Sequence, residues 1–152
     1  MDEVIRELNE ELECLMDQTS REITEMKSYL KRNRARIKVF PRIKKSSGYN
    51  TFSIIWKRFY YYDWKTGRHK TRDIRKGRGH MVPRGRLLLY LKDSEAWEID
   101  YILEKEQEFA RTRKKVALLS KTITILKKYS RKHKSSINRE GNQDHVVTEG
   151  IH

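Results

Sequence analysis

The sequence contains little of what stabilises small secreted domains or spans membranes. Among its 152 residues there is one cysteine, Cys14, so no internal disulfide can form, which is typical of a protein in a reducing cytoplasm. No apolar run approaches the roughly 18 residues that a membrane-spanning helix needs. The N-terminal stretch MDEVIRELNEE is acidic and does not resemble a signal peptide. We therefore expect a cytoplasmic protein that makes no contact with a membrane.

Sequence signatures of enzymes are also missing. There is no GxSxG motif, no GxxxxGK[ST] motif and no pair of acids in the basic middle of the chain. The run Tyr60–Tyr62 resembles a set of relaxase nucleophiles, but these need a nearby metal-binding histidine cluster. The five histidines show no ligand spacing (residues 69, 80, 133, 145 and 152). A chain of 152 residues also has no room for the Arg-His-Arg constellation of a tyrosine recombinase. We predict no catalytic residue, no metal site and no cofactor.

Acidic residues are nearly absent from two long stretches. Residues 31–92 contain 20 Lys or Arg against 2 Asp or Glu, and residues 111–135 contain 10 against none. Residues 1–30 and 93–110 each carry −6 and the tail 136–152 carries −2, so the whole chain carries +14. A positive field concentrated in this way attracts a polyanion. Solubility alone does not require it, and we predict that the chain binds nucleic acid.

Two long helices are predicted on either side of the basic middle. Apolar residues advance by three or four positions from Ile5 to Leu30 without Gly or Pro, which predicts a helix over 3–32. A second helix is predicted from Asp93 or Ser94 to about Tyr129. Its stripe follows a heptad spacing and consists of Trp97, Ile102, Phe109, Val116, Leu119, Ile123 and Leu126. An antiparallel coiled coil within one chain would place acidic 1–15 beside basic 115–129. Homodimerisation through the same stripes is the competing interpretation.

Between the helices the apolar pattern changes to a period of two. RIKVFPRIKK (36–45) predicts an edge strand because it contains Pro41, and TFSIIWKRFYYYD (51–63) predicts the strongest strand of the chain. SSGYN (46–50) predicts a turn. A hairpin loop in which Gly67 takes a positive φ then leads to a third strand, RHKTRDIRK (68–76). GRGHMVPRG (77–85) predicts a flexible connector, and RLLLYL (86–91) predicts a short helix packed on the sheet.

These elements predict an α+β fold. A three-stranded antiparallel sheet or ribbon is inserted between two long helices that pair as an antiparallel coiled coil, and a short helix backs the sheet. The predicted units are a coiled-coil helix (1–33), a basic β-ribbon DNA-binding domain (34–92), a second coiled-coil helix (93–130) and a disordered tail (131–152).

Strand alternation would divide the rings and cations of the hairpin between two faces. With the bulge at Gly67, we expect Tyr62 opposite Lys70, Tyr60 opposite Arg72, Arg58 opposite Ile74 and Trp56 opposite Lys76, all on one face. The other face would carry Lys57, Ile55, Phe59 and Tyr61 and would seat Leu87–Leu91. We expect the first face to contact the nucleic acid.

An antiparallel ribbon of this kind fits the major groove of double-stranded DNA, where Arg and Lys reach guanine edges. Flanking cations would bind phosphates and release counterions. The predicted DNA contacts are Lys44, Lys45, Lys57, Arg58, Tyr60, Tyr62, Lys65, Arg68, Lys70, Arg72, Arg75, Lys76, Arg78, Arg84 and Arg86.

The stretch IIWKRFYYYDWKTGRHKTRDIRKGRGHMVPRGRL resembles the central region of MobI-type conjugative mobilisation proteins. The resemblance covers about residues 50–90, and the flanking helical segments are similar in layout. That family is carried by integrative conjugative elements and large conjugative plasmids. The resemblance implies an auxiliary factor that recognises the origin of transfer and helps the relaxase to initiate transfer, and it supplies no residue-level assignment. The sheet is also similar in architecture to the three-stranded arm-type DNA-binding domains of integrases.

Three functions stay open on the sequence alone. The leading hypothesis is an accessory protein of the relaxosome that binds double-stranded DNA at the origin of transfer (oriT), with a relaxase or another relaxosome protein as its partner. The second is a transcriptional or phage-type regulator that uses the same ribbon on a promoter. The third is a coiled-coil adaptor whose basic segment contacts an acidic partner protein.

Overall fold

The structure, a computed structural model, describes residues 1–46, 51–63 and 65–151; the side chains of Tyr62 and of residues 139–151 lie outside this description. The described elements are α1 (Asp2–Arg32), β1 (Val39–Lys45), β2 (Phe52–Tyr62), β3 (His69–Ile74), α2 (Arg84–Tyr90) and α3 (Ala96–Ile151). The strands form one antiparallel sheet in the order β1-β2-β3. The predicted α+β class is confirmed, and β1 with Pro41 is an edge strand. The predicted turn at 46–50 lies mostly outside the described residues.

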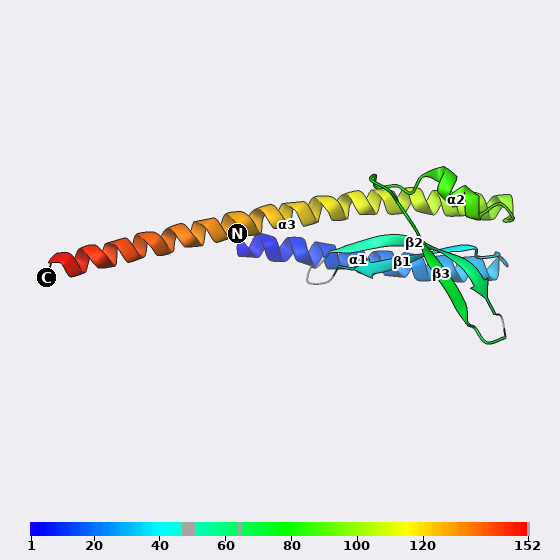
Figure 1. Cartoon of the computed structure of the whole chain (residues 1–152), viewed down its shortest axis with the longest axis horizontal. Coiled ribbons are helices and arrows are strands. Elements are labelled where there is room, and N and C mark those ends of the chain that lie inside the picture. Colours follow the sequence, from blue (N-terminus) through cyan, green and yellow to red (C-terminus); the bar gives the residue numbers. More distant parts are fainter. Residues whose placement is uncertain (47–50, 64, 152) are drawn as a thin grey trace.

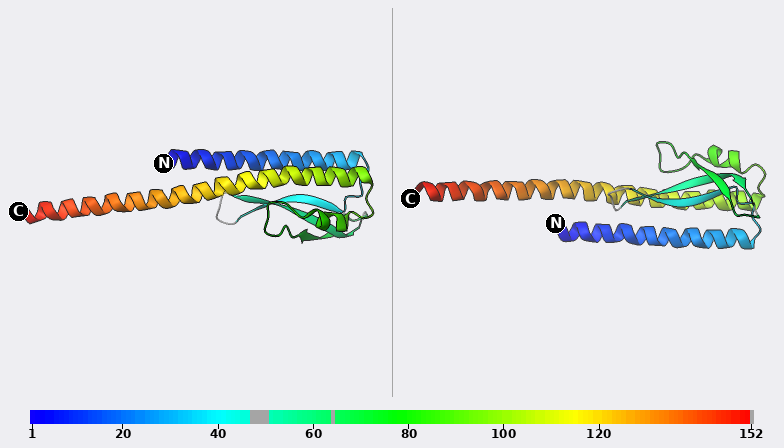
Figure 2. Two further views of the ribbon diagram at one scale, coloured as in Figure 1. Left: turned by 90° about the horizontal axis from the view of Figure 1, so that it is seen from above. Right: turned by 60° about the horizontal axis from the view of Figure 1, so that its bottom comes forward.

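Helices α1 and α3 lie side by side and run in opposite directions (Figures 1 and 2). At one end of the pair the ring of Tyr29 stacks on that of Tyr101, with 4.5 Å between centroids. At the other end Lys134 Nζ lies 3.4 Å from Asp2 Oδ2. The apolar faces of both helices contribute to one buried core. The acidic start of α1 therefore lies along the basic part of α3. Coiled-coil geometry for this pair stays a prediction.

Lys105 is the cation in the acidic part of α3. Its Nζ lies 3.2 Å from Glu108 Oε2 and 5.6 Å from the ring centroid of Tyr101. Burial by itself lowers the pKa of Lys105, but the hydrogen bond and charge of Glu108, helped by Tyr101 and by Glu22 of α1, raise it above its ordinary value. Glu22 of α1 thus attracts Lys105 of α3 across the helix pair.

Helix α3 continues far beyond the start of α1 (Figure 1). The sequence predicted that this helix ends near residue 130 and that a disordered tail follows, whereas the helix runs to Ile151. Apolar periodicity stops at that point because no neighbouring element remains to pack against. Residues 131–140 nevertheless contain no Gly or Pro that would end a helix. The loss of apolar periodicity after about residue 130 therefore indicated that no element packs against the helix there, and not that the helix ends.

The face of the sheet that carries Trp56 packs on α3. The ring centroid of Trp56 lies 5.8 Å from that of Phe109. The same core takes in Phe52, Ile54, Val39 and Ile74 from the sheet, Val82, Leu87 and Leu91 from the region of α2, and Ile102 and Val116 from α3. The prediction that this face meets DNA is wrong at the base of the hairpin, and α2 backs this face instead of the opposite one. Burying Phe52, Ile54 and Trp56 removes more apolar surface from water than burying the opposite face, Ser53, Ile55 and Lys57, would.

The observed register of β2 and β3 differs from the predicted one. Trp56 lies opposite Ile74 and Arg58 opposite Arg72, two positions from the predicted pairs. The register then shifts again between Phe59 and Tyr61, where β2 is irregular. Gly67 does take a positive φ of 71°, as predicted, but the bulge that sets the register lies in β2 and not in the loop. A shift of two residues keeps each side chain on its original face, whereas the bulge changes the faces beyond it.

Two glycines give a matched test of these backbone assignments. We expect Gly67→Ala to lower the free energy of unfolding by about 1 kcal/mol, because an L-residue is strained at a φ of 71°. We expect Gly85→Ala to raise it by about 0.5–1 kcal/mol, because Gly85 lies in α2 and an added Cβ meets nothing within 4 Å. Urea unfolding followed by circular dichroism measures both. A Gly67→Ala protein as stable as the parent would contradict the left-handed assignment.

Candidate nucleic-acid interface

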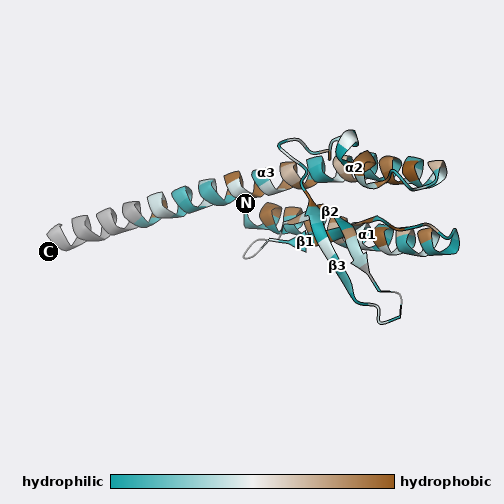
Figure 3. Cartoon of the chain, turned by 45° about the vertical axis from the view of Figure 1, so that its right-hand side comes forward, coloured by the Kyte–Doolittle hydropathy of each residue, from teal (hydrophilic) through white to brown (hydrophobic). Residues whose placement is uncertain are grey.

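The outer part of the β2–β3 hairpin, residues 59–72, projects away from the helix pair and is called the hairpin arm below (Figures 1 and 3). Tyr60 and Tyr61 are each 50% exposed, although large rings are ordinarily well buried. The exposed cations of the arm are Lys65, Arg68, Lys70 and Arg72. Figure 3 shows the arm in mainly hydrophilic colours, in contrast to the hydrophobic segments of the helix pair. The arm therefore presents rings and cations together to solvent.

The two acids in and beside the arm are already occupied. Asp63 Oδ1 accepts a hydrogen bond of 2.9 Å from the Lys65 backbone N–H, and this bond, together with the Thr66 hydroxyl, lowers the pKa of Asp63. Asp73 Oδ1 lies 3.6 Å from Lys57 Nζ. Within the part of the chain that the structure describes, the four exposed cations of the arm form no ion pair. Their charge is therefore available to an external anion.

The irregularity at Tyr60 determines how the tyrosines are presented. The guanidinium of Arg72 lies over the Tyr60 ring, 5.2 Å from its centroid, and Tyr61 lies opposite Lys70. Each exposed ring is thus beside a cation, an arrangement that can stack on a base or approach a phosphate. The sequence prediction placed Tyr61 on the protected face because it assumed strict alternation. No sequence signal marked the bulge that exposes Tyr61.

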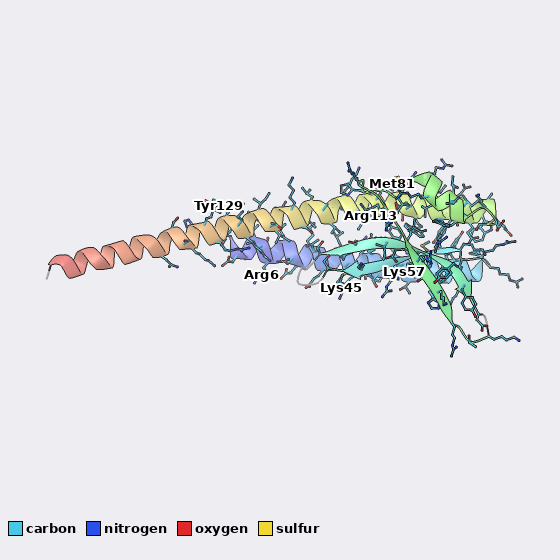
Figure 4. The ribbon with its side chains drawn as sticks, viewed as in Figure 1. Arg6, Lys45, Lys57, Met81, Arg113 and Tyr129 are labelled. Atoms are coloured by element: carbon cyan, nitrogen blue, oxygen red, sulfur yellow. The ribbon has the colours of Figure 1, made fainter. Side chains whose placement is uncertain are left out.

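The predicted DNA contacts do not form one surface. The structure brings Tyr60, Lys65, Arg68, Lys70 and Arg72 together on the arm. Lys45 pairs with Phe52, the first residue of β2, whereas the arm begins at Phe59, about 23 Å further along the strand. Figure 4 shows Lys45 at that far end of the sheet. The remaining exposed arginines of the prediction lie after β3 (Arg75), on the connector (Arg78) and on α2 (Arg84 and Arg86).

Several of the predicted contacts already have partners within the protein. The guanidinium of Arg58 lies over the ring of Tyr90 at 4.9 Å. Lys76 Nζ donates to the carbonyl of Gly79, and Arg86 donates to the carbonyl of Arg75. The contact between Arg58 and Tyr90 joins the sheet to α2, and the two hydrogen bonds lie in the segment that follows β3 and between this segment and α2. A DNA contact at any of these side chains stays a prediction, as does one at Tyr62, whose side chain lies outside the described residues.

A buried ion pair fixes the base of the hairpin on α3. Arg113 donates from Nη1 to Glu106 Oε2 at 2.8 Å, and the two side chains are only 6% and 3% exposed. Glu106 also accepts hydrogen bonds from Trp56 Nε1 (2.8 Å) and from the backbone N–H of Val82 (2.7 Å). Arg113 further donates to the carbonyls of Ile54 (3.1 Å) and His80 (2.8 Å). Figure 4 shows Arg113 on α3 beside the sheet and the connector. The network joins β2, the connector and α3.

The connector 77–85, which the sequence predicted to be flexible, is thus anchored in its second half.

A second buried acid of α3 anchors the segment between α1 and β1. Glu98, 2% exposed, accepts from the backbone N–H groups of Ile37 (3.0 Å) and Arg36 (3.4 Å). Glu98 and Glu106 both face chain segments that lack a regular ladder of hydrogen bonds. Each carboxylate accepts hydrogen bonds from backbone N–H groups that would otherwise be buried without a partner.

Glu106 and Arg113 are not among the residues predicted from the sequence, although the sequence contains a signal for them. The apolar stripe runs through Ile102, Phe109 and Val116 at intervals of seven, and Glu106 and Arg113 occupy the alternate positions four residues after Ile102 and Phe109. Residues at this spacing share a helix face. A charged residue at such a position indicates a buried, partnered charge.

No group of three or more His, Cys, Asp or Glu side chains within the described ranges could hold a metal ion. No helix among the described residues combines the length and the apolar character that crossing a membrane requires.

In a comparison with known protein families, residues 8–127 match a model described as MobI protein. The match spans most of α1, the whole sheet with its arm, α2 and the part of α3 that lies along α1. The chain belongs to the MobI family. Membership confirms the resemblance drawn from the central residues and makes this MobI-family chain a mobilisation accessory protein. No curated protein and no solved structure matches it.

Proposed function

We propose that this MobI-family protein binds double-stranded DNA at the origin of transfer through its hairpin arm and helps a relaxase to begin mobilisation. In this proposal the protein acts in the bacterial cytoplasm and has no catalytic role of its own. The observation that carries the proposal is the projecting arm, which presents two half-exposed tyrosines together with four exposed cations that form no ion pair among the described residues.

The dimensions and chemistry of the arm support duplex DNA as the ligand. A two-stranded antiparallel ribbon fits the major groove, and a guanidinium can bind the O6 and N7 atoms of guanine in a bidentate way. Arg68 and Arg72 have this capacity, while Lys65 and Lys70 supply point charges for phosphates. The buried Glu106–Arg113 pair holds the hairpin base to α3, so the arm is presented from a fixed base. A fixed base lowers the entropy lost on binding.

Footprinting on the DNA of the element that carries the gene tests this function directly, together with a fluorescence anisotropy titration. We expect protection of one site at the origin of transfer, and affinity for that duplex about 1,000-fold or more above a scrambled duplex at moderate salt. Equal affinity for both duplexes would overturn site recognition. A protected site at a promoter, and none at the origin of transfer, would favour the transcriptional regulator instead. The slope of log K against log salt counts the phosphate contacts.

A further inference from the structure

Helix α3 carries a second apolar stripe that faces away from α1. Leu118, Ile125 and Tyr129 are 67%, 57% and 59% exposed. Successive members are separated by seven and four residues, so all three lie on one line along the helix. Val116 and Ile123, which are buried in the core, lie about 150° away around the same helix. We call Leu118, Ile125 and Tyr129 the outer stripe; Figure 4 labels Tyr129 on α3.

Positive charge borders the outer stripe on both sides. The exposed lysines at helix positions next to it are Lys114, Lys121 and Lys132 on one side and Lys115 on the other. Residues 111–135 contain no acid that could neutralise them. A single exposed Leu would be unremarkable on any surface, but a line of apolar residues flanked by three lysines on one side and by one on the other is typical of a helix that pairs with another helix.

The opposite side of α3 shows what such a pattern binds. There α3 packs against α1, whose first 15 residues contain one basic and six acidic residues, net −5. Apolar residues of α1 at helical spacing, such as Leu8 and Leu12, join the core with Val116 and Ile123. Asp2 of α1 pairs with Lys134 of α3. The inner side of α3 thus holds an acidic amphipathic helix, and the outer stripe offers the same combination of apolar line and flanking lysines.

We propose that the outer stripe docks an acidic amphipathic helix of a partner protein, beyond the DNA-binding role of the arm. A second copy of this chain fits less well, because two-fold pairing of outer stripes would bring two rows of lysines together. Nucleic acid also fits less well, because three apolar side chains would be placed against phosphates. Burial of the stripe removes apolar surface from water, and the flanking lysines select the negatively charged partner.

Designed peptides test the proposal on the full-length protein. The probe is a labelled four-heptad peptide with Leu at positions a and d and Glu at e and g. Two matched peptides carry either Lys in place of Glu or Ser in place of Leu. We expect the acidic Leu peptide to bind at least ten times more tightly than either of them. The double variant Leu118→Ser, Ile125→Ser should weaken that binding tenfold or more. Leu89→Ser, at an apolar residue of α2 that is 54% exposed, should leave it unchanged.

A charge-reversed variant gives an independent readout that the loss of an apolar contact cannot mimic. With Lys114→Glu and Lys121→Glu, the protein should prefer the Lys peptide over the Glu peptide. Circular dichroism of each variant confirms that the exposed substitutions leave the helix content intact.

Four outcomes would overturn the proposal. The first is that the peptide binds the stripe variant as tightly as the parent. The second is that binding disappears only with Arg68→Ala and Lys70→Ala, which would place the peptide on the arm. The third is that sedimentation shows a parent dimer that the stripe variant loses, which would make the stripe a self-association surface. The fourth is that the stripe variant loses affinity for duplex DNA. DNA binding is measured on the same proteins. A parent protein that does not bind duplex DNA would contradict the proposed function of the arm, whatever the peptides show.

Discussion

Replacing Arg113 by methionine is expected to lower the free energy of unfolding by about 3–5 kcal/mol. The substitution leaves the Glu106 carboxylate, only 3% exposed, without its cationic partner. It also removes the donors to the carbonyls of Ile54 and His80. A buried charge stripped of its partner loses Coulomb attraction and keeps its desolvation cost, so the loss should greatly exceed that for an exposed pair such as Arg6 and Glu10.

Urea unfolding of the full chain measures this effect, and Lys114→Met provides the matched control. Lys114 is the next residue of α3 and is exposed, so the same change in side-chain type should alter the free energy of unfolding by no more than about 0.5 kcal/mol. The double variant Glu106→Gln, Arg113→Met should recover part of the loss, because it removes the unpaired charge. An Arg113→Met protein within 1 kcal/mol of the parent would show that the pair does not hold the hairpin base to α3.

Those parts of the fold that depend on local sequence pattern could be predicted. The period of apolar residues gave α1 and the start of α3, Pro41 placed β1 at the sheet edge, and Gly67 marked the hairpin loop. In each case one residue type or one spacing decides the local conformation with little help from distant contacts. The basic, ring-rich hairpin was likewise visible in the sequence as the candidate site.

The parts that depend on packing could not be predicted. Trp56 and Tyr60 lie four residues apart in one strand, a spacing that places side chains on the same face of a regular strand. Trp56 is nevertheless fully buried, whereas Tyr60 is half exposed. The difference arises because α3 covers only the base of the hairpin and because β2 has an irregularity between Phe59 and Tyr61. Glu106 and Glu104 illustrate the same limit, since only one of these two acids of α3 is buried. Tertiary contacts determine which of the two acids pairs with Trp56, Val82 and Arg113.

The same packing divides the predicted contacts into those free to bind and those engaged. Arg58 and Arg72 lie directly opposite each other in the sheet, and each guanidinium lies over a tyrosine ring. The ring beneath Arg58 belongs to Tyr90 at the end of α2, so Arg58 helps to close the core. The ring beneath Arg72 is the exposed Tyr60, so both groups of that pair remain accessible. The boundary between scaffold and interface therefore lies between these two arginines.

The triple variant Arg68→Ala, Lys70→Ala, Arg72→Ala is expected to lower the affinity for the origin-of-transfer duplex by about 100-fold or more at moderate salt. All three side chains are exposed, and none forms an ion pair with an acid among the described residues, so the substitutions should leave folding unchanged. Each phosphate contact that is lost should also reduce the slope of log K against log salt by about 0.9. A contact to a base edge would lower the affinity with little change in slope.

The matched control removes three charges from another surface, with Arg21→Ala, Lys27→Ala and Lys31→Ala on α1. These side chains are exposed, and the net charge falls from +14 to +11 in both triple variants. Anisotropy titrations at several salt concentrations separate a local contact from a general electrostatic effect. If DNA lies on the arm, the control should keep most of its affinity and its full salt slope, because charges beyond about 10 Å are screened at 0.1 M salt. Equal losses in the two triple variants would mean that the total charge of the protein, and not the arm, attracts the duplex.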